Sequence, residues 1–275
     1  MDNSIFEPFI RKWDLAVDGA QIVTHTSSLL PVFFNGRVAM LKVATDIKEK
    51  LGVNLMMWWN GEGAAEVFEH FGDAVLMERA TGSRSLFEMA QHGQDDEASA
   101  IICAATARLH QTRKQESPEL LPLAHWFEAI LARPREGIFA DCARAAELLL
   151  SEPRDVCPLH GDIHHANILD FGNRGWLAID PKGVIGERTF DYANIFCNPN
   201  HHIATTAGRL ERQLRVIASS ADLEETRLLH WVLAWAGLSA TWLIEDKLQE
   251  HVEPTLQVAR IAAAVIDNRS AKISS

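Results

Sequence analysis

The stretch at residues 160–167 reads His160-Gly161-Asp162-Ile163-His164-His165-Ala166-Asn167, and the interpretation of the whole chain depends on it. Asp162 and Asn167 show the D-x-x-x-x-N spacing of loops that transfer phosphoryl groups. In such loops the aspartate receives the proton of the acceptor hydroxyl, and the asparagine holds Mg²⁺. The spacing therefore predicts Asp162 as the catalytic residue and Asn167 as a metal ligand.

A second oxygen ligand follows at the end of a predicted strand. Residues 175–180, GWLAID, form a short apolar run that ends in Asp180. Proteins usually hold Mg²⁺ with one or two carboxylates and with phosphates of the substrate. Asp180 is therefore the second predicted metal ligand, and Mg²⁺ is the predicted metal.

The three histidines of the 160–167 stretch allow a different interpretation. Histidines beside an aspartate could bind a transition metal, and Gly-Asp-x-His also occurs in metallophosphoesterases. That class needs an Asp-x-His motif upstream and a Gly-Asn-His-Glu/Asp block downstream, and the sequence has neither. Phosphoryl transfer is the favoured interpretation.

The composition is that of an acidic, folded protein. The chain has 275 residues, of which 47% are hydrophobic and 23% charged, and a formal net charge of −11. This length suffices for two lobes around a cleft. The negative charge disfavours nucleic acid and favours a cationic partner. No basic leader is present, and no apolar stretch approaches the roughly 18 residues of a membrane span. We expect a cytoplasmic protein with no nucleic-acid or membrane partner.

The first part of the chain predicts a small sheet. Asn35-Gly36 between two apolar runs predicts a hairpin. The predicted strands cover residues 29–34, 37–43, 65–68 and 74–78.

One lysine lies inside the second predicted strand. Lys42 is either an exposed residue or the lysine that binds nucleotide phosphates, and the Asp162 motif favours the second role. A helix is predicted at residues 46–58, where Glu49 is the candidate carboxylate that orients Lys42.

Two further segments are predicted to contact the nucleotide. The chain has no glycine-rich loop, and Thr26, Ser27 and Ser28 stand in its place with hydroxyl and backbone donors for phosphates. Residues 78–82 are the predicted link between the lobes, where the backbone of Glu78 and Ala80 would meet the nucleotide base.

The chain after Gly82 is predicted to be mainly helical. The predicted helices cover residues 95–113, 123–131, 138–150, 203–218, 223–245 and 253–266. Trp231, Trp235 and Trp242 recur along one of them, a stripe that usually marks core packing. Trp242 is also a candidate for lining a substrate pocket.

Several of these stretches resemble one family over nearly the whole chain: the aminoglycoside phosphotransferases, and within them the streptomycin 6-kinase and hydroxyurea-resistance branch. The most specific stretches are G-D-x-H-H-x-N at 161–167 and G-W-L-x-I-D-P at 175–181. The others are Thr26-Ser27-Ser28, Leu41-Lys42, W-x-N-G-x-G-A at 58–64, Leu76-Met77-Glu78 and L-S-A-x-W at 238–242.

The resemblance implies an α+β, protein-kinase-like bilobal fold. Its N-lobe, residues 1–80, would hold a small antiparallel sheet and bind the nucleotide, and its C-lobe, residues 81–275, would be mostly helical. It implies transfer of the γ-phosphoryl group of ATP or GTP to a hydroxyl of an aminoglycoside-type antibiotic, with streptomycin as the leading substrate.

The substrate-binding residues are predicted from charge. An acidic pocket would suit a cationic antibiotic. The candidates for that pocket are Glu187, Asp191, Glu245 and Asp246, together with Trp242. The alternatives are a kinase of another small hydroxyl metabolite or of hydroxyurea, and a nucleotide-binding pseudokinase. The four residues that phosphoryl transfer requires are all present, which argues against the pseudokinase. They are Lys42, Asp162, Asn167 and Asp180.

Overall fold

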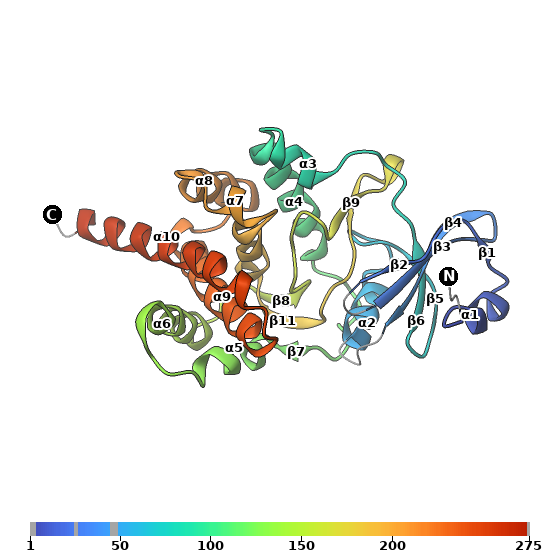
Figure 1. Ribbon diagram of the computed structural model, residues 1–275, viewed down its shortest axis with the longest axis horizontal. Coiled ribbons are helices and arrows are strands. Elements are labelled where there is room, and N and C mark those ends of the chain that lie inside the picture. The colour runs from blue at the N-terminus through green and yellow to red at the C-terminus, as the bar shows by residue number, and fades with distance from the viewer. Residues whose placement is uncertain (1–3, 25–26, 45–48, 274–275) are drawn as a thin grey trace.

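A six-stranded antiparallel sheet forms the N-terminal region of the computed structural model, which describes residues 4–24, 27–44 and 49–273 (Figure 1). The strands are β1 (Ala16–Val17), β2 (Ile22–Val23), β3 (Ser27–Phe34), β4 (Arg37–Ala44), β5 (Val67–Phe71) and β6 (Ala74–Glu78). The predicted hairpin is confirmed. Asn35 and Gly36 have φ values of 49° and 75°, as the two-residue turn between β3 and β4 requires.

Residue alternation gives this sheet two different faces. The outer face packs on the region of α1 (Glu7–Lys12) in a core cluster of Phe6, Trp13, Leu15, Leu30, Val32, Ala39, Leu41, Ala74 and Leu76. Lys42 follows the buried Leu41, so its side chain leaves the sheet on the other face. There it lies in register between Leu29 of β3 and Val75 of β6. This inner face is turned toward α2 (Glu49–Trp59).

The second region of the chain is mostly helical (Figure 1). Its helices are α3 (Leu86–Gln91), α4 (Asp95–Leu109), α5 (Leu123–Leu131), α6 (Gly137–Ser151), α7 (His201–Ala204), α8 (Arg209–Ala221), α9 (Glu225–Glu245) and α10 (Gln249–Ile273). Each predicted helix has a counterpart, although α8 begins six residues later and α10 begins four residues earlier than predicted. Residues 79–85, where the predicted lobe boundary falls, form neither helix nor strand. The α+β organisation is confirmed.

Helix α9 is the most apolar element of the helical region. Contrary to the expectation from sequence, its 21 residues meet the length and hydropathy of a membrane-spanning helix. However, 67% of that apolar window is buried inside the protein. It packs against α6, α10 and the 3₁₀ segment η2 (Arg188–Cys197), with Trp231 fully buried. Packing inside the helical region accounts for its composition.

Short strands bring the two predicted motifs together. β7 (Leu121–Pro122), β11 (Val184–Glu187) and β8 (Val156–Leu159) form one small sheet. β9 (Ile168–Asp170) and β10 (Trp176–Ala178), joined through the 3₁₀ turn η1 (Gly172–Arg174), form an antiparallel pair. The 160–167 loop enters β9 and Asp180 follows β10. Ala178 lies opposite Ile168, and Ile179 N–H donates to Asn167 C=O at 2.9 Å, so the loop and Asp180 meet at one end of the pair.

Candidate active site

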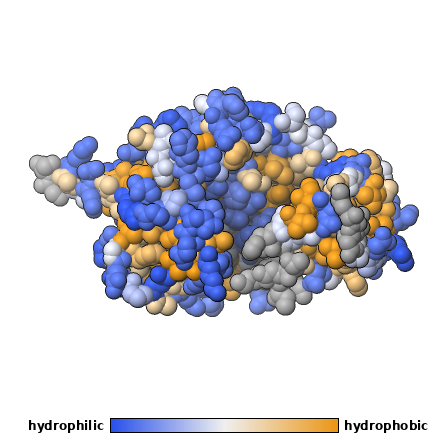
Figure 2. Space-filling model, viewed as in Figure 1, coloured by the Kyte–Doolittle hydropathy of each residue, from blue (hydrophilic) through white to orange (hydrophobic). Residues whose placement is uncertain are grey.

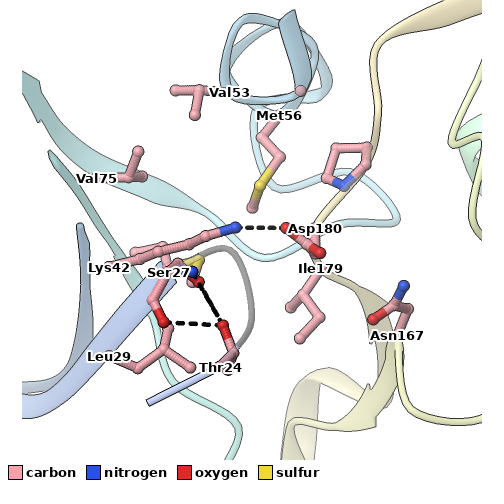
Figure 3. Close-up of a pocket in the computed structure, with 13 residues that line it drawn as sticks. Thr24, Ser27, Leu29, Lys42, Val53, Met56, Val75, Asn167, Ile179 and Asp180 are labelled. Carbon is pink, nitrogen blue, oxygen red and sulfur yellow. Dashed lines mark hydrogen bonds and ion pairs between the residues drawn. The ribbon is translucent and has the colours of Figure 1, made fainter. Parts of the chain in front are cut away.

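A cavity of about 290 Å³ lies between the inner face of the sheet and the helical region. It is lined by Thr24, Ser27, Leu29, Lys42, Gly52, Val53, Met56, Val75, Met77, Asn167, Ile179, Asp180 and Pro181. Figure 3 shows Lys42 and Asp180 pointing toward each other across it, with Asn167 beyond Ile179. The surface is hollowed between the two regions, and both hydrophilic and hydrophobic residues surround the hollow (Figure 2). The cavity thus combines an apolar wall with a few charged and polar groups, as small-molecule sites do.

Asp180 lies between two ammonium groups. Lys42 Nζ forms an ion pair with its Oδ1, and Lys182 Nζ lies 2.7 Å from its Oδ2. Burial raises the pKa of Asp180, but the charges of Lys42 and Lys182 outweigh it and lower the pKa below the ordinary value. Its φ of 61° is in the left-handed region, a strained conformation that functional sites often retain. Asp180 is therefore held ionised at the cavity wall.

The amide of Asn167 has a defined orientation. Its Nδ2 donates to the backbone C=O of Asp162 at 2.9 Å and to Asp162 Oδ2 at 3.2 Å. A carbonyl only accepts, so the nitrogen must face Asp162 and the oxygen must face away from it. Within the described residues Asn167 Oδ1 has no hydrogen-bond partner, and Figure 3 shows it on the cavity side. Asn167 Oδ1 and the Asp180 carboxylate are thus two oxygen donors on one wall, a set that fits Mg²⁺.

The Asp162 carboxylate is restrained on both oxygens. Asn194 Nδ2 donates to Oδ1 at 2.9 Å, and Oδ2 receives Asn167 Nδ2 and lies 3.7 Å from His164 Nε2. Burial raises the pKa of Asp162, but the hydrogen bond and charge of His164, followed by the charge of Lys182, lower it to about 2. Asp162 is therefore an anion at neutral pH. No spacing in the sequence pointed to Asn194 or Lys182.

His160 supports the 160–167 loop from inside the protein. Its Nδ1 accepts from Asp162 N–H at 3.2 Å, so its Nε2–H donates to Ile179 C=O at 2.8 Å. The ring is fully buried and stacks on Trp59 with the centroids 6.3 Å apart. Burial lowers the pKa of His160, which keeps it neutral.

Asp191 is an internal anchor of the same loop, and the prediction that it binds substrate is corrected. Its oxygens accept from the N–H groups of His160 and Gly161 at 2.9 and 2.8 Å and from His110 Nε2 at 2.8 Å. Its side chain has no solvent exposure. A carboxylate enclosed in this way cannot reach a bound substrate.

The prediction that Glu187 binds substrate is corrected for the same reason. Its carboxylate accepts two hydrogen bonds from Arg227 at 2.6 and 2.7 Å and one from Trp231 Nε1 at 2.9 Å. Arg154 N–H adds a fourth at 3.0 Å, and the side chain is 1% exposed. Glu187 joins β11 to α9 inside the protein.

The predicted nucleotide-loop residues differ in their placement. Thr26 lies outside the described residues. Ser27 lines the cavity, and its Oγ lies 3.0 Å from Thr24 Oγ1. Ser28 is on the opposite face of β3, where Gln21 donates to its Oγ at 3.4 Å. The Ser28 hydroxyl therefore points away from the cavity, which corrects its predicted role.

The other predicted nucleotide contacts lie at the edges of the site. Glu49 is the first residue of α2, and its side chain is outside the described part of the structure. The Glu78 carboxylate pairs with Arg174 at 2.8 Å, and the Glu78 N–H donates to Glu66 C=O at 2.8 Å. The Ala80 N–H and C=O have no hydrogen-bond partner among the described residues.

An aromatic wall adjoins the 160–167 loop. Trp242 is half-buried and packs edge-on against Trp126 and Trp235, with centroids 5.4 and 5.8 Å apart. A Cβ at Gly161 would lie 2.9 Å from the Trp126 ring, so this wall reaches the loop itself. Glu245 and Asp246 are exposed at the end of α9, one turn beyond Trp242. The sequence did not single out Trp126.

Three comparisons identify related proteins. The profile of the aminoglycoside/hydroxyurea antibiotic resistance kinases matches residues 12–247. The chain is 49% identical to a streptomycin 3''-kinase of Klebsiella pneumoniae, over 86% of this chain and 91% of that protein. It is 28% identical to a streptomycin 6-kinase of Streptomyces griseus, over 92% and 87%. It is also 28% identical to a hydroxyurea phosphotransferase of Kitasatospora aureofaciens, over 92% and 76%.

Solved structures share the fold. An aminoglycoside phosphotransferase in ternary complex with ADP and hygromycin B has a TM-score of 0.67 at 14% identity, over 95% of this chain and 98% of that chain. Choline kinase from Cryptosporidium parvum has a TM-score of 0.63 at 14% identity, over 96% and 95%. The predicted protein-kinase-like fold is confirmed. With the family profile covering most of its length, the chain belongs to the aminoglycoside/hydroxyurea antibiotic resistance kinases.

Proposed function

We propose that this protein transfers the γ-phosphoryl group of ATP to streptomycin, with the 3'' hydroxyl as the acceptor. As a member of its family the protein is a phosphotransferase with an alcohol group as acceptor. The observation that supports the reaction is the convergence of Lys42, Asn167 and Asp180 in one cavity beside Asp162. The choice of acceptor is supported by the 49% identity to a streptomycin 3''-kinase, against 28% to a streptomycin 6-kinase.

The nucleotide would occupy the cavity between the two regions. Leu29, Val75 and Met77 give it an apolar surface for the base. Ala80, between the two regions, offers backbone groups that pair with none of the described residues. Lys42 supplies positive charge to the phosphates from the inner face of the sheet. Ser27 adds a hydroxyl at the same end of the cavity.

Asn167 Oδ1 and the Asp180 carboxylate would hold Mg²⁺. When bound, the metal would neutralise charge on the phosphate oxygens. The protein contributes an ionised Asp180, kept so by Lys42 and Lys182, and an Asn167 amide whose oxygen faces the cavity. Two protein ligands leave room for phosphate and water, which Mg²⁺ prefers.

Asp162 would orient the acceptor hydroxyl and take its proton. Its lowered pKa keeps the carboxylate ionised at neutral pH, so that it can accept the proton. Phosphoryl transfer has a loose transition state, in which positioning contributes most of the rate.

The acceptor would lie on the side of the aromatic wall. Trp242 and Trp126 would pack on a sugar ring close to Asp162. Glu245 and Asp246 would attract the cationic groups of the antibiotic from the end of α9, helped by the net charge of −11. We expect these two carboxylates to affect KM for the acceptor more than kcat.

A substrate panel tests the proposal. ADP release is measured with Mg²⁺ and either ATP or GTP against streptomycin, other aminoglycosides, hydroxyurea and small alcohols. Phosphorus–proton NMR of the product then locates the new phosphate. Saturable turnover of streptomycin with the phosphate at the 3'' position is expected. Phosphorylation at the 6 position would contradict the proposed 3'' acceptor hydroxyl. Turnover of hydroxyurea alone would contradict the proposal that the substrate is an antibiotic.

A further inference from the structure

We propose that Asn194 is a positioning residue for the reaction: it holds the catalytic carboxylate through a directional chain of hydrogen bonds that runs from Trp235 through Asn194 to Asp162. The proposal rests on the proposed role of Asp162 but not on which molecule is the acceptor.

The direction of the chain follows from what each group can do. Trp235 Nε1–H can only donate, and it donates to Asn194 Oδ1 at 2.9 Å. Asn198 Nδ2 donates to the same oxygen at 3.0 Å, and to the Asn194 backbone carbonyl at 2.9 Å. Two donors on Oδ1 prevent the amide from turning over. Nδ2 of Asn194 must therefore face Asp162 Oδ1, which it contacts at 2.9 Å.

This contact determines the plane of the Asp162 carboxylate. It is the closest side-chain hydrogen bond that Asp162 receives, since Asn167 Nδ2 lies 3.2 Å and His164 Nε2 lies 3.7 Å from the other oxygen. With one amide on each oxygen, the carboxylate cannot rotate without breaking a bond. Asn167 is also a predicted metal ligand, whereas the Asn194 amide contacts the reacting groups through Asp162.

Trp235, the first donor of this series of hydrogen bonds, is held rigidly. Trp235 is 6% exposed and packs edge-on between Phe190 and Trp242, with ring centroids 5.4 and 5.8 Å away. The indole is thus fixed by the same aromatic wall that adjoins the loop. Two hydrogen bonds therefore connect the packed indole of Trp235 to the carboxylate of Asp162.

An isosteric substitution gives the most specific test. Asn194→Asp keeps the acceptor for Trp235 but places a second carboxylate oxygen next to Asp162 Oδ1. Two ionised carboxylates at this distance repel each other, so the Asp162 carboxylate would be displaced from its position. We expect kcat of Asn194→Asp at neutral pH to fall at least as far as that of Asn194→Ala, with KM for ATP at the parent value.

Removal of the amide should lower the rate without affecting nucleotide binding. Asn194→Ala is expected to reduce kcat about tenfold to a hundredfold, the cost of a misplaced reacting group. KM for ATP and the thermal shift caused by ADP should stay at the parent values. These readouts also show whether each variant is folded.

Helix α9 provides a matched pair of controls. Trp235→Phe and Trp231→Phe each remove one buried indole donor, and both rings pack on Phe190. Trp231 donates to Glu187, so its loss should lower Tm and leave kcat unchanged. Trp235→Phe should lower kcat. In the Asn194→Ala background the same substitution should lower kcat no further.

The proposal is overturned if Asn194→Asp keeps the parent kcat, or if the two tryptophan variants lower kcat equally. Should Asn194→Asp not fold, the tryptophan pair decides the question alone. If the panel shows no acceptor, the same measurements on ATP hydrolysis, with water as acceptor, separate a failure of this proposal from a failure of the proposed function.

Discussion

Asp162 is the residue whose chemistry can be tested most directly. Asp162→Asn keeps the shape of the side chain but removes the charge that accepts the hydroxyl proton. We expect kcat to fall by about 10²–10⁴, the usual contribution of a positioned acid or base, with ADP binding retained. Asp141→Asn, which changes an exposed carboxylate of α6, is the control and should match the parent. A rate within a few-fold of the parent would remove Asp162 from the reaction.

The reacting residues were predictable because a local pattern encodes them. Asp162 and Asn167 lie on one loop, and Asp180 follows the next hairpin strand, β10, so their spacing in sequence translates into proximity. Lys42 was predicted from its place inside an apolar strand together with the Asp162 motif. Asn194 was missed because its contact with Asp162 spans 32 residues and depends on the fold.

Two of the corrected predictions at this scale share a cause. The prediction of Glu187 and Asp191 as substrate carboxylates depends on charge alone, because an acidic pocket suits a cationic ligand. A sequence does not show that Arg227 will reach one of them, or that backbone N–H groups will surround the other. The prediction for Ser28 is wrong for a different reason. Successive side chains of β3 point to opposite faces of the sheet, so Ser28 points away from the cavity that Ser27 lines.

At the scale of elements, α2 packs directly on the segment that carries Asp180. A Cβ at Gly52 would lie 1.9 Å from the Pro181 carbonyl oxygen, and a Cβ at Gly183 would lie 2.6 Å from Leu51. Gly183 also has a φ of 66°. Only glycine allows this close approach, so the two glycines fix the distance between α2 and the metal-binding segment.

Gly52→Ala should therefore disturb both stability and catalysis. The added methyl group must push α2 away from Pro181, at a cost of about 1–3 kcal/mol in the free energy of unfolding. The shift moves Asp180, so kcat and the affinity for nucleotide should fall together. Asn54→Ala, on the exposed side of the same helix, is the control and should leave Tm and kcat at the parent values. An unchanged Tm in Gly52→Ala would contradict this prediction, because it would show that α2 can move away from Pro181 at no cost in stability.

The elements were more predictable than their limits. The Asn35-Gly36 turn and the bounds of α5 agree with the sequence, because the turn needs positive φ and the α5 apolar pattern is sharp. α10 runs well beyond its predicted range of 253–266. Pro254 lies inside the first turns of the observed helix and Asp267 is exposed on its last turns.

At the scale of the molecule, buried ion pairs connect distant segments. Arg209 of α8 donates to both oxygens of Asp95 in α4 at 2.8 and 2.9 Å. Arg227 of α9 does the same to Glu187 of β11. Burial raises the pKa of each carboxyl group, but the hydrogen bonds from arginine lower it below the ordinary value. The fold therefore depends on two carboxylates staying ionised.

This dependence predicts how stability changes with pH. A carboxyl group whose pKa is lower in the folded than in the unfolded state contributes stability above the ordinary carboxyl range, near about pH 4. That stability is lost as pH falls through the folded pKa. Glu187→Gln should lower Tm at pH 7, because Arg227 is left buried without its counter-charge, a loss of about 3–5 kcal/mol. The difference in Tm from the parent should shrink as pH falls below about 4, because Glu187 takes up a proton first in the unfolded parent and then, at its lower pKa, in the folded parent.

The control is an ion pair of the same kind on the surface. Glu147 pairs with Arg135 at 2.6 Å, but both side chains are exposed, and exposed pairs add little stability. Glu147→Gln should follow the parent Tm at every pH. If Glu187→Gln also follows the parent, the pair between β11 and α9 contributes no net stability. If its deficit in Tm stays constant down to pH 3, the loss comes from altered packing around Trp231 and not from charge.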